Sequence, residues 1–281
     1  MKRRIENRLL PLLFLAALFI SLGTGLLLKK GEQNWFGEDA AMSREFRSLS
    51  LSDEMLDFLK REEDNPGRLA GLYLLETGFG EKIFRGTYDP RQFEDFETKW
   101  KRYDSYRTYE TVCEQLWDDV EYFPVPTAIN DKTATVSFTD SWLYERNYRE
   151  GGAHEGTDIM ADINRRGYYP VISMTDGIIT NLGWLEMGGY RVGITAPKGA
   201  YFYYAHLSSY ANLKEGMEIK AGDLLGFMGD SGYGKEEGTV GKFPVHLHVG
   251  VYLYPEGRET SYNPYWILRF LEMHKMRCKF L

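Results

Sequence analysis

Two histidines in one short β-rich run restrict the fold of this chain more than any other feature of the sequence. His246 and His248 stand on either side of Leu247, at the start of a run that continues to Leu253. Residues i and i+2 of a strand project from the same face. The run therefore predicts a strand that directs both imidazoles into one cleft and places Leu247 in the core of a sheet.

The sequence around that strand changes character near residue 122. Before it, apolar residues recur every three or four positions, as in Phe93, Phe96 and Trp100, which is typical of amphipathic helices. After it, β-branched and aromatic runs alternate with glycine-bearing turns, which predicts short antiparallel strands. The expected strands are 133–138, 169–174, 177–182, 190–195, 201–206, 224–228 and 246–253, followed by a closing helix from about Pro264. The sequence thus predicts an α+β chain, with a helical region over 31–121 and an antiparallel β-sheet domain over 122–281.

The first thirty residues differ in kind from the rest of the chain. Four basic residues precede an apolar run from Leu9 to Leu28, and Lys29 and Lys30 follow it. Twenty helical residues span about 30 Å, the thickness of a bilayer core, and the flanking charges favour an amino terminus inside the cell. The alternative is a cleaved signal peptide, with Gly23 and Gly25 near the cut site. We favour an uncleaved membrane anchor because the apolar run continues to Leu28. Either reading implies that the bulk of the chain is exported.

Charge and cysteine content exclude some functions and leave others open. The formal net charge is −7, from 34 basic and 41 acidic residues, which argues against a nucleic-acid partner. Cys113 and Cys278 form no CxxC pair, so a cysteine-based metal site is excluded. The two thiols can form one disulfide or remain free, and the sequence does not distinguish these outcomes.

Metal-binding residue types gather in the β-rich region. These are His154 and Asp158 in an HxxxD arrangement, His206 at the end of an aromatic strand, and the pair His246 and His248. Imidazole and carboxylate are good zinc ligands, and a catalytic zinc takes three protein ligands and keeps one open position. A single histidine is more often structural than a ligand. The joint occurrence of HxxxD, HxH and a further histidine in one region favours a metal site, with two histidines to spare for acid, base or oxyanion roles.

With these motifs the sequence resembles the lysostaphin/LytM family of zinc endopeptidases, which cleave peptidoglycan peptides. The resemblance covers roughly residues 123–271. The matching motifs are HEGTD at 154–158, YYAHL at 203–207, KAGDLLGFMGDSG at 220–232 and HLH at 246–248. It implies a zinc-dependent hydrolase that acts on stem peptides or cross-bridges of peptidoglycan.

The resemblance also implies a role for each residue of the constellation. His154, Asp158 and His248 are the expected zinc ligands, whereas His206 and His246 are expected to assist catalysis. The alternative is a catalytically inactive envelope scaffold or binding protein with the same fold. Such proteins typically lose a ligand or a catalytic histidine, and this chain keeps all five positions.

Three features extend or depart from the family pattern. A tyrosine shortly before HxxxD can stabilise the tetrahedral intermediate; Tyr148 is the favoured candidate, Tyr144 competes with it, and a packing role is equally plausible. The stretch 233–245 is longer than in many relatives, so we expect it at the rim of the cleft, where it would govern the choice of peptide. The helical region carries no resemblance and is the expected place for a protein partner.

Overall fold

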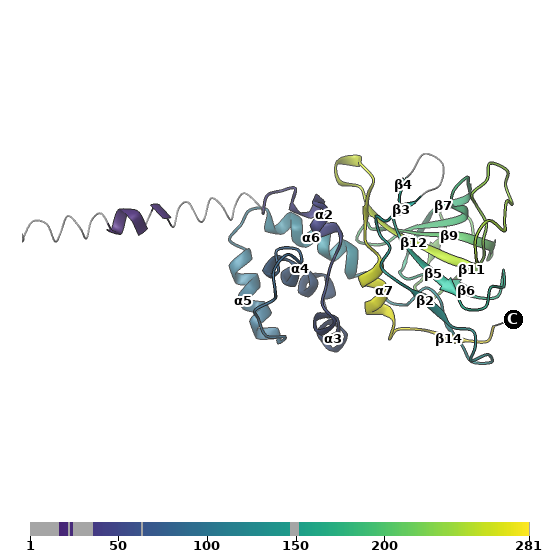
Figure 1. The fold of residues 1–281 in the computed structure, drawn as a ribbon, viewed down its shortest axis with the longest axis horizontal. Coiled ribbons are helices and arrows are strands. Elements are labelled where there is room, and N and C mark those ends of the chain that lie inside the picture. Colours follow the sequence, from purple (N-terminus) through teal and green to yellow (C-terminus); the bar gives the residue numbers. More distant parts are fainter. Residues whose placement is uncertain (1–16, 22, 25–35, 63, 147–151, 281) are drawn as a thin grey trace, which may run out of the picture.

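The computed structural model describes residues 17–21, 23–24, 36–62, 64–146 and 152–280 (Figure 1). The helices of the first half gather on one side of the molecule and the strands on the other, with α7 (Tyr265–Leu271) between them. The predicted apolar span from Leu9 to Leu28 lies largely outside the described residues. Within the described part of the chain, no helix combines the length and the apolar content that a membrane crossing requires.

Short helices build the region before residue 119. Their bounds are η1 (Ala40–Met42), α2 (Arg44–Arg47), α3 (Asp53–Glu62), α4 (Pro66–Glu76), α5 (Pro90–Trp100) and α6 (Tyr106–Trp117). Helices α4 and α6 cross closely because glycine removes the side chains at the crossing: a Cβ at Gly71 would lie 2.7 Å from the Sγ atom of Cys113. Cys113 is buried there, and both it and Cys278 are free thiols.

One antiparallel sheet forms the second half of the chain, in the order β10-β7-β8-β9-β12-β5-β2. The bounds of these strands are β2 (Val136–Phe138), β5 (Thr157–Ala161), β7 (Gly177–Leu185), β8 (Gly189–Thr195), β9 (Tyr201–Tyr210), β10 (Glu218–Ile219) and β12 (His246–Leu253). Three further strands join this sheet off the main path, namely β6 (Pro170–Ile172), β11 (Leu224–Met228) and β13 (Thr260–Tyr262).

The sheet has a core face and a second face, as the alternation of residues predicts. On β12, Leu247, Val249 and Val251 are fully buried in the hydrophobic core. His246 and His248 therefore project from the opposite face, which confirms the prediction made from the HxH spacing.

All seven expected strands and the closing helix are present, but the prediction was incomplete. Strand β5, which carries Asp158, was not expected, and the strand that ends in the prediction at His206 continues to Tyr210. The domain is also not wholly antiparallel, because β1 (Thr127–Ala128) pairs in parallel with β14 (Arg277–Cys278). A separate two-stranded pair, β3 (Glu145–Arg146) and β4 (Gly152–Ala153), precedes β5, and the short helix η2 (Pro255–Gly257) follows β12.

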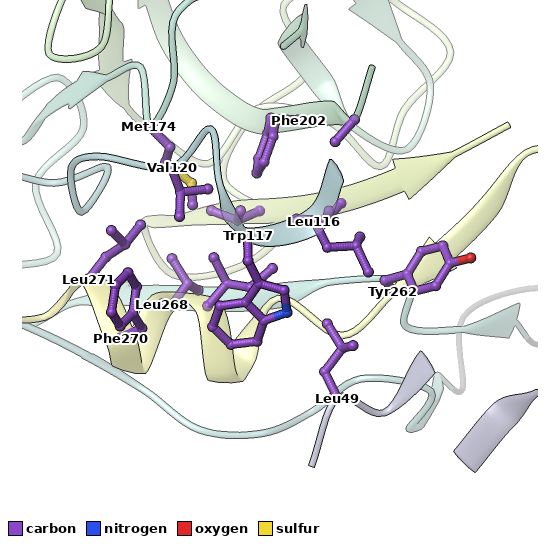
Figure 2. Close-up of a cluster of buried hydrophobic side chains, with 14 of the residues drawn as sticks. Leu49, Leu116, Trp117, Val120, Met174, Phe202, Tyr262, Leu268, Phe270 and Leu271 are labelled. Atoms are coloured by element: carbon purple, nitrogen blue, oxygen red, sulfur yellow. The ribbon is translucent and has the colours of Figure 1, made fainter. Parts of the chain in front are cut away.

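The helices and the sheet share one continuous hydrophobic core. Figure 2 shows Leu116 and Trp117 of α6 among side chains of the second half of the chain, and the ring of Trp117 meets that of Phe270 edge-on at 6.1 Å. The Tyr262 hydroxyl donates a hydrogen bond to the carbonyl of Ala41 at 3.2 Å. The helical region is therefore packed onto the sheet domain rather than tethered to it.

Candidate metal centre

Three predicted ligands converge at one point on the face of the sheet. Asp158 of β5 pairs with His248 of β12 in the strand register, and His154 reaches them from the segment before β5. His154 Nε2 lies 3.1 Å from Asp158 Oδ1 and 3.0 Å from His248 Nδ1, and His248 Nδ1 lies 2.9 Å from Asp158 Oδ1. The structure thus brings together the three residues that the sequence nominated as a ligand set.

The dimensions of this triangle suit a tetrahedral metal ion. Zinc bonds of about 2.0 to 2.1 Å imply ligand-to-ligand distances of about 3.3 Å, close to the three edges found here. The opposite ring nitrogen of His154, Nδ1, lies 3.0 Å from the carbonyl oxygen of Ser141 and donates to it in one tautomer. That tautomer leaves a lone pair on Nε2, which faces the triangle.

Electrostatics keep the carboxylate of the triangle ionised. Burial alone would raise the pKa of Asp158, but hydrogen bonding to His154 and then to His248 outweighs burial, so the pKa lies well below its ordinary value. Because a carboxylate binds a metal in its deprotonated form, Asp158 is a competent ligand over the whole physiological pH range.

Gly156, which lies between the first two ligands in the sequence, packs so closely against His248 that no side chain fits at this position. A Cβ at this position would lie 2.5 Å from His248 Cε1 and 2.5 Å from the carbonyl oxygen of Val249. Contacts this short force either the imidazole or the strand to move. Gly156 therefore belongs to the site although it offers no side chain to the metal.

We expect Gly156→Ala to weaken zinc binding about 10- to 100-fold, the range typical of changes to groups that orient a metal ligand. Zinc competition with a fluorescent chelator measures this. Gly152→Ala is the matched control, since a Cβ there meets nothing within 4 Å, and it should bind zinc like the parent chain. Equal affinity in the two variants would show that His248 tolerates the displaced geometry.

The two remaining histidines lie beside the triangle. The rings of His206 and His246 are 4.7 Å apart, and His246 Nε2 lies 3.8 Å from Asp158 Oδ1. Their Nδ1 atoms lie 2.8 Å from the carbonyls of Ser231 and Pro244, so each ring has the same tautomer-fixing contact as His154.

His206 occupies an unusual backbone position. Its φ of 64° is left-handed, and the ladders that β9 forms with β8 and β11 both shift register near it. Irregularities of this kind re-aim a side chain at functional sites. Burial, followed by repulsion from His246 and His248, lowers the pKa of His206 well below its ordinary value, so the imidazole is neutral at physiological pH.

The stretch 233–245 covers these two histidines. The ring of Tyr233 stacks on His206 at 5.9 Å, and the ring of Phe243 contacts both His206, at 4.6 Å, and His246, at 4.9 Å. The stretch therefore lies at the site, as expected from its place in the sequence. It also packs against the imidazoles, which the sequence did not indicate.

Of the two tyrosines nominated for oxyanion stabilisation, the structure describes only Tyr144. Tyr148 lies outside the described part of the chain, so its role stays a prediction. The side chain of its competitor Tyr144 is 65% exposed, and its carbonyl accepts a hydrogen bond from the backbone N–H of His154 at 3.0 Å.

The helical region reaches the segment that holds His154. The guanidinium of Arg47 lies over the ring of Trp142 at 5.5 Å and donates to the carbonyl of Ser261. Trp142 directly follows Ser141, whose carbonyl contacts His154 Nδ1. Because Arg47 and Trp142 are more than ninety positions apart in the sequence, no local sequence motif predicts this contact.

Comparison with known proteins assigns both halves of the chain. The LytM N-terminal domain matches residues 31–119, and peptidase family M23 matches residues 152–264. A crystal structure from Ruminococcus gnavus, described as a candidate glycyl-glycine endopeptidase LytM, is 50% identical with a TM-score of 0.80, and the alignment covers 85% of this chain and 94% of that one.

Curated relatives match over shorter stretches. The L-Ala–D-Glu endopeptidase of Bacillus subtilis is 37% identical over 158 residues, which is 56% of this chain and 45% of the relative. Lysostaphin of Staphylococcus simulans is 32% identical over 114 residues, 36% of this chain and 22% of the relative. The chain therefore spans less than half the length of these relatives.

Proposed function

The chain belongs to peptidase family M23, and from this premise we propose that it is a zinc-dependent endopeptidase that hydrolyses peptide bonds of peptidoglycan. The resemblance inferred from its motifs is confirmed, and the helical region, in which the motifs showed none, has a family match of its own. The observation that carries the proposal is the convergence of His154, Asp158 and His248 beside two further buried histidines.

The residues of the site divide into two chemical roles in this proposal. Zinc held by the His154, Asp158 and His248 side chains would supply Lewis-acid polarisation of the scissile carbonyl and activation of water. His206 and His246, each with Nδ1 beside a backbone carbonyl, present Nε2 as the basic nitrogen. Either is suited to accept a proton from the attacking water and to return it to the leaving amine.

Two kinds of peptide bond are candidates for cleavage. The Bacillus relative is named for the bond between L-alanine and D-glutamate, whereas the Ruminococcus structure is described by cleavage between glycines. These correspond to the stem peptide and to a cross-bridge of the wall polymer. We propose peptidoglycan as the substrate class.

A location outside the cytoplasmic membrane is part of the proposal, since peptidoglycan lies there. Its support is the basic segment before Leu9 and the apolar run to Leu28, which favour an anchor with an exoplasmic peptidase. Amino-terminal sequencing of the mature protein from membranes tests this: a start near Met1 supports an anchor, and a start near Leu26 identifies a cleaved signal peptide.

Hydrolysis of purified peptidoglycan tests the proposed activity. We expect the zinc-loaded full-length chain to release soluble fragments whose masses, by mass spectrometry, define the cleaved bond. Chelation of the metal should abolish release, because the nucleophile depends on the metal, and added zinc should restore it. A zinc-loaded chain that binds the polymer and cuts nothing would instead identify the inactive scaffold considered from the sequence.

A further inference from the structure

Arg191 of β8 carries a guanidinium that lacks a counter-ion in the structure. Among the described residues, its side chain makes no ion pair and no hydrogen bond, and its Nη1 atom is buried and unpartnered. Other arginines of the chain, such as Arg68 and Arg166, are paired with carboxylates. Buried polar atoms without partners are rare in folded proteins and cost stability. Arg191 therefore has no acceptor among the described residues, and a bound substrate would supply one.

The sheet places Arg191 on the face that carries the metal centre. Val192 and Ile194 are buried in the core, so Arg191, one residue earlier, projects from the opposite face. On the neighbouring strand Ala205 pairs with His248, and Ala205 lies in the register shift that faces Arg191. Arg191 and His248 are thus two strand spacings apart, with Ala205 between them, which gives about 10 Å between their Cα atoms.

Two tyrosines of β9 complete a group of hydrogen-bond donors around Arg191. The Tyr201 hydroxyl occupies the space that a Cβ at Gly193 would fill, and the Tyr203 hydroxyl occupies the space beside Gly188, so both rings lean toward β8 on either side of Arg191. The ring of Tyr203 also lies 5.9 Å from that of His248.

Neither tyrosine hydroxyl donates a hydrogen bond to a residue that the structure describes. Burial raises the pKa of both hydroxyls, and the charge of Arg191 only partly offsets this, so both remain protonated at neutral pH. The acid whose charge reaches them, Glu259, accepts a hydrogen bond from Tyr254 and forms no ion pair with Arg191. Within the described part of the chain, the group thus consists of donors and has no acceptor.

We propose that Arg191, with Tyr201 and Tyr203, binds a carboxylate of the substrate within about three residues of the scissile bond, so that the chain cuts near an acidic residue rather than inside a glycine bridge. A guanidinium binds a carboxylate with two parallel hydrogen bonds. A glutamyl residue keeps one free carboxylate whichever of its carboxyls forms the peptide bond, whereas glycine has none. An extended peptide covers about 3.3 to 3.6 Å per residue, so a 10 Å separation puts this carboxylate within about three residues of the metal. The inference rests on the proposed peptidase function.

A pair of peptides that differ in one group tests the proposal. The first is L-alanyl-γ-D-glutamyl-L-lysine with its carboxyl terminus blocked as an amide, and the second is the same peptide with the free glutamyl carboxylate also converted to a carboxamide. The zinc-loaded full-length chain should prefer the acid by about 10- to 100-fold in kcat/KM, the range for a hydrogen bond to a charged group, and should cut pentaglycine more slowly than the acid. Arg191→Gln should bring the ratio of acid to amide close to one. Arg277→Gln, which removes an exposed arginine from β14, is the matched control and should keep the preference of the parent.

The outcomes separate this inference from the proposed function. Equal rates on acid and amide by the parent chain, or equal slowing of both by Arg191→Gln, would overturn the role of Arg191. If the parent hydrolyses none of the peptides, calorimetric Kd values for the acid and the amide decide the inference, and the proposed function fails only if peptidoglycan is also left uncut. A 10- to 100-fold difference that disappears in Arg191→Gln would support carboxylate binding, and equal Kd values would refute it.

Discussion

Replacing His248 by alanine is expected to remove most of the bound zinc and to slow peptide hydrolysis about 10³-fold or more. His248 Nδ1 lies 2.9 to 3.0 Å from the donor atoms of Asp158 and His154, so its loss leaves two of three ligands. Metal-ion catalysis contributes several kcal/mol of transition-state stabilisation, and each 1.4 kcal/mol is about tenfold in rate. Zinc content by plasma mass spectrometry and rates on peptidoglycan fragments measure the two effects together.

The control for this substitution is His274→Ala, which removes a histidine that follows the end of α7 and contacts the ring of Phe270, outside the ligand triangle, and should leave zinc content and rate near those of the parent. Full retention of zinc by the His248→Ala chain would remove His248 from the ligand set. Loss of zinc with normal hydrolysis would remove the metal from the reaction.

Substitution of His206 or His246 by alanine is expected to slow hydrolysis about 10²- to 10⁴-fold while zinc content stays close to one ion per chain. General acid and base groups contribute rate factors of this size. Both imidazoles lie beside the ligand triangle, which consists of His154, Asp158 and His248, and His246 Nε2 lies 3.8 Å from Asp158 Oδ1. The measurement is kcat/KM on a defined peptide, with zinc determined on the same samples.

Circular dichroism of these two variants separates chemistry from structure, because Tyr233 and Phe243 pack on the same imidazoles. A folded variant that lost its zinc would show that ligand and catalytic roles have been exchanged between the histidines. Near-normal rates in both variants would leave the acid–base role without a residue among those predicted.

The fold and the metal triangle could be predicted from the sequence where they depend on the spacing of residues within one strand or one helix. The two-residue period of His246 and His248 fixes their shared face whatever the rest of the sheet does. Strand β5 was missed because its start, Thr157 and Asp158, follows a glycine in a polar string that is typical of a loop. Its pairing with β12, about ninety residues away, supplies what the local sequence lacks.

Other parts of the site depend on register between distant strands and could not be predicted in this way. The glycine of the HEGTD motif was a usable signal, since glycine often marks a close approach, but its partner His248 is identified only once β5 and β12 are paired. Arg191 is one of many arginines in the sequence. That Nη1 of this side chain has no partner among the described residues is known only once the strands around it are placed.

The core shared by the helices and the sheet has a consequence for how this protein can change by recombination. Its two halves match separate families, over residues 31–119 and 152–264, yet Trp117 of the first packs on Phe270, which follows the second. Two segments joined by a polar linker can be exchanged singly between relatives, because few contacts cross the boundary. In this protein, a helical region taken from a relative would carry apolar side chains that fit the closing helix of that relative and not α7. The mismatch would reduce packing in both the helical region and the sheet domain. Recombination must therefore transfer the two halves together, or be followed by compensating substitutions at the contacts between them.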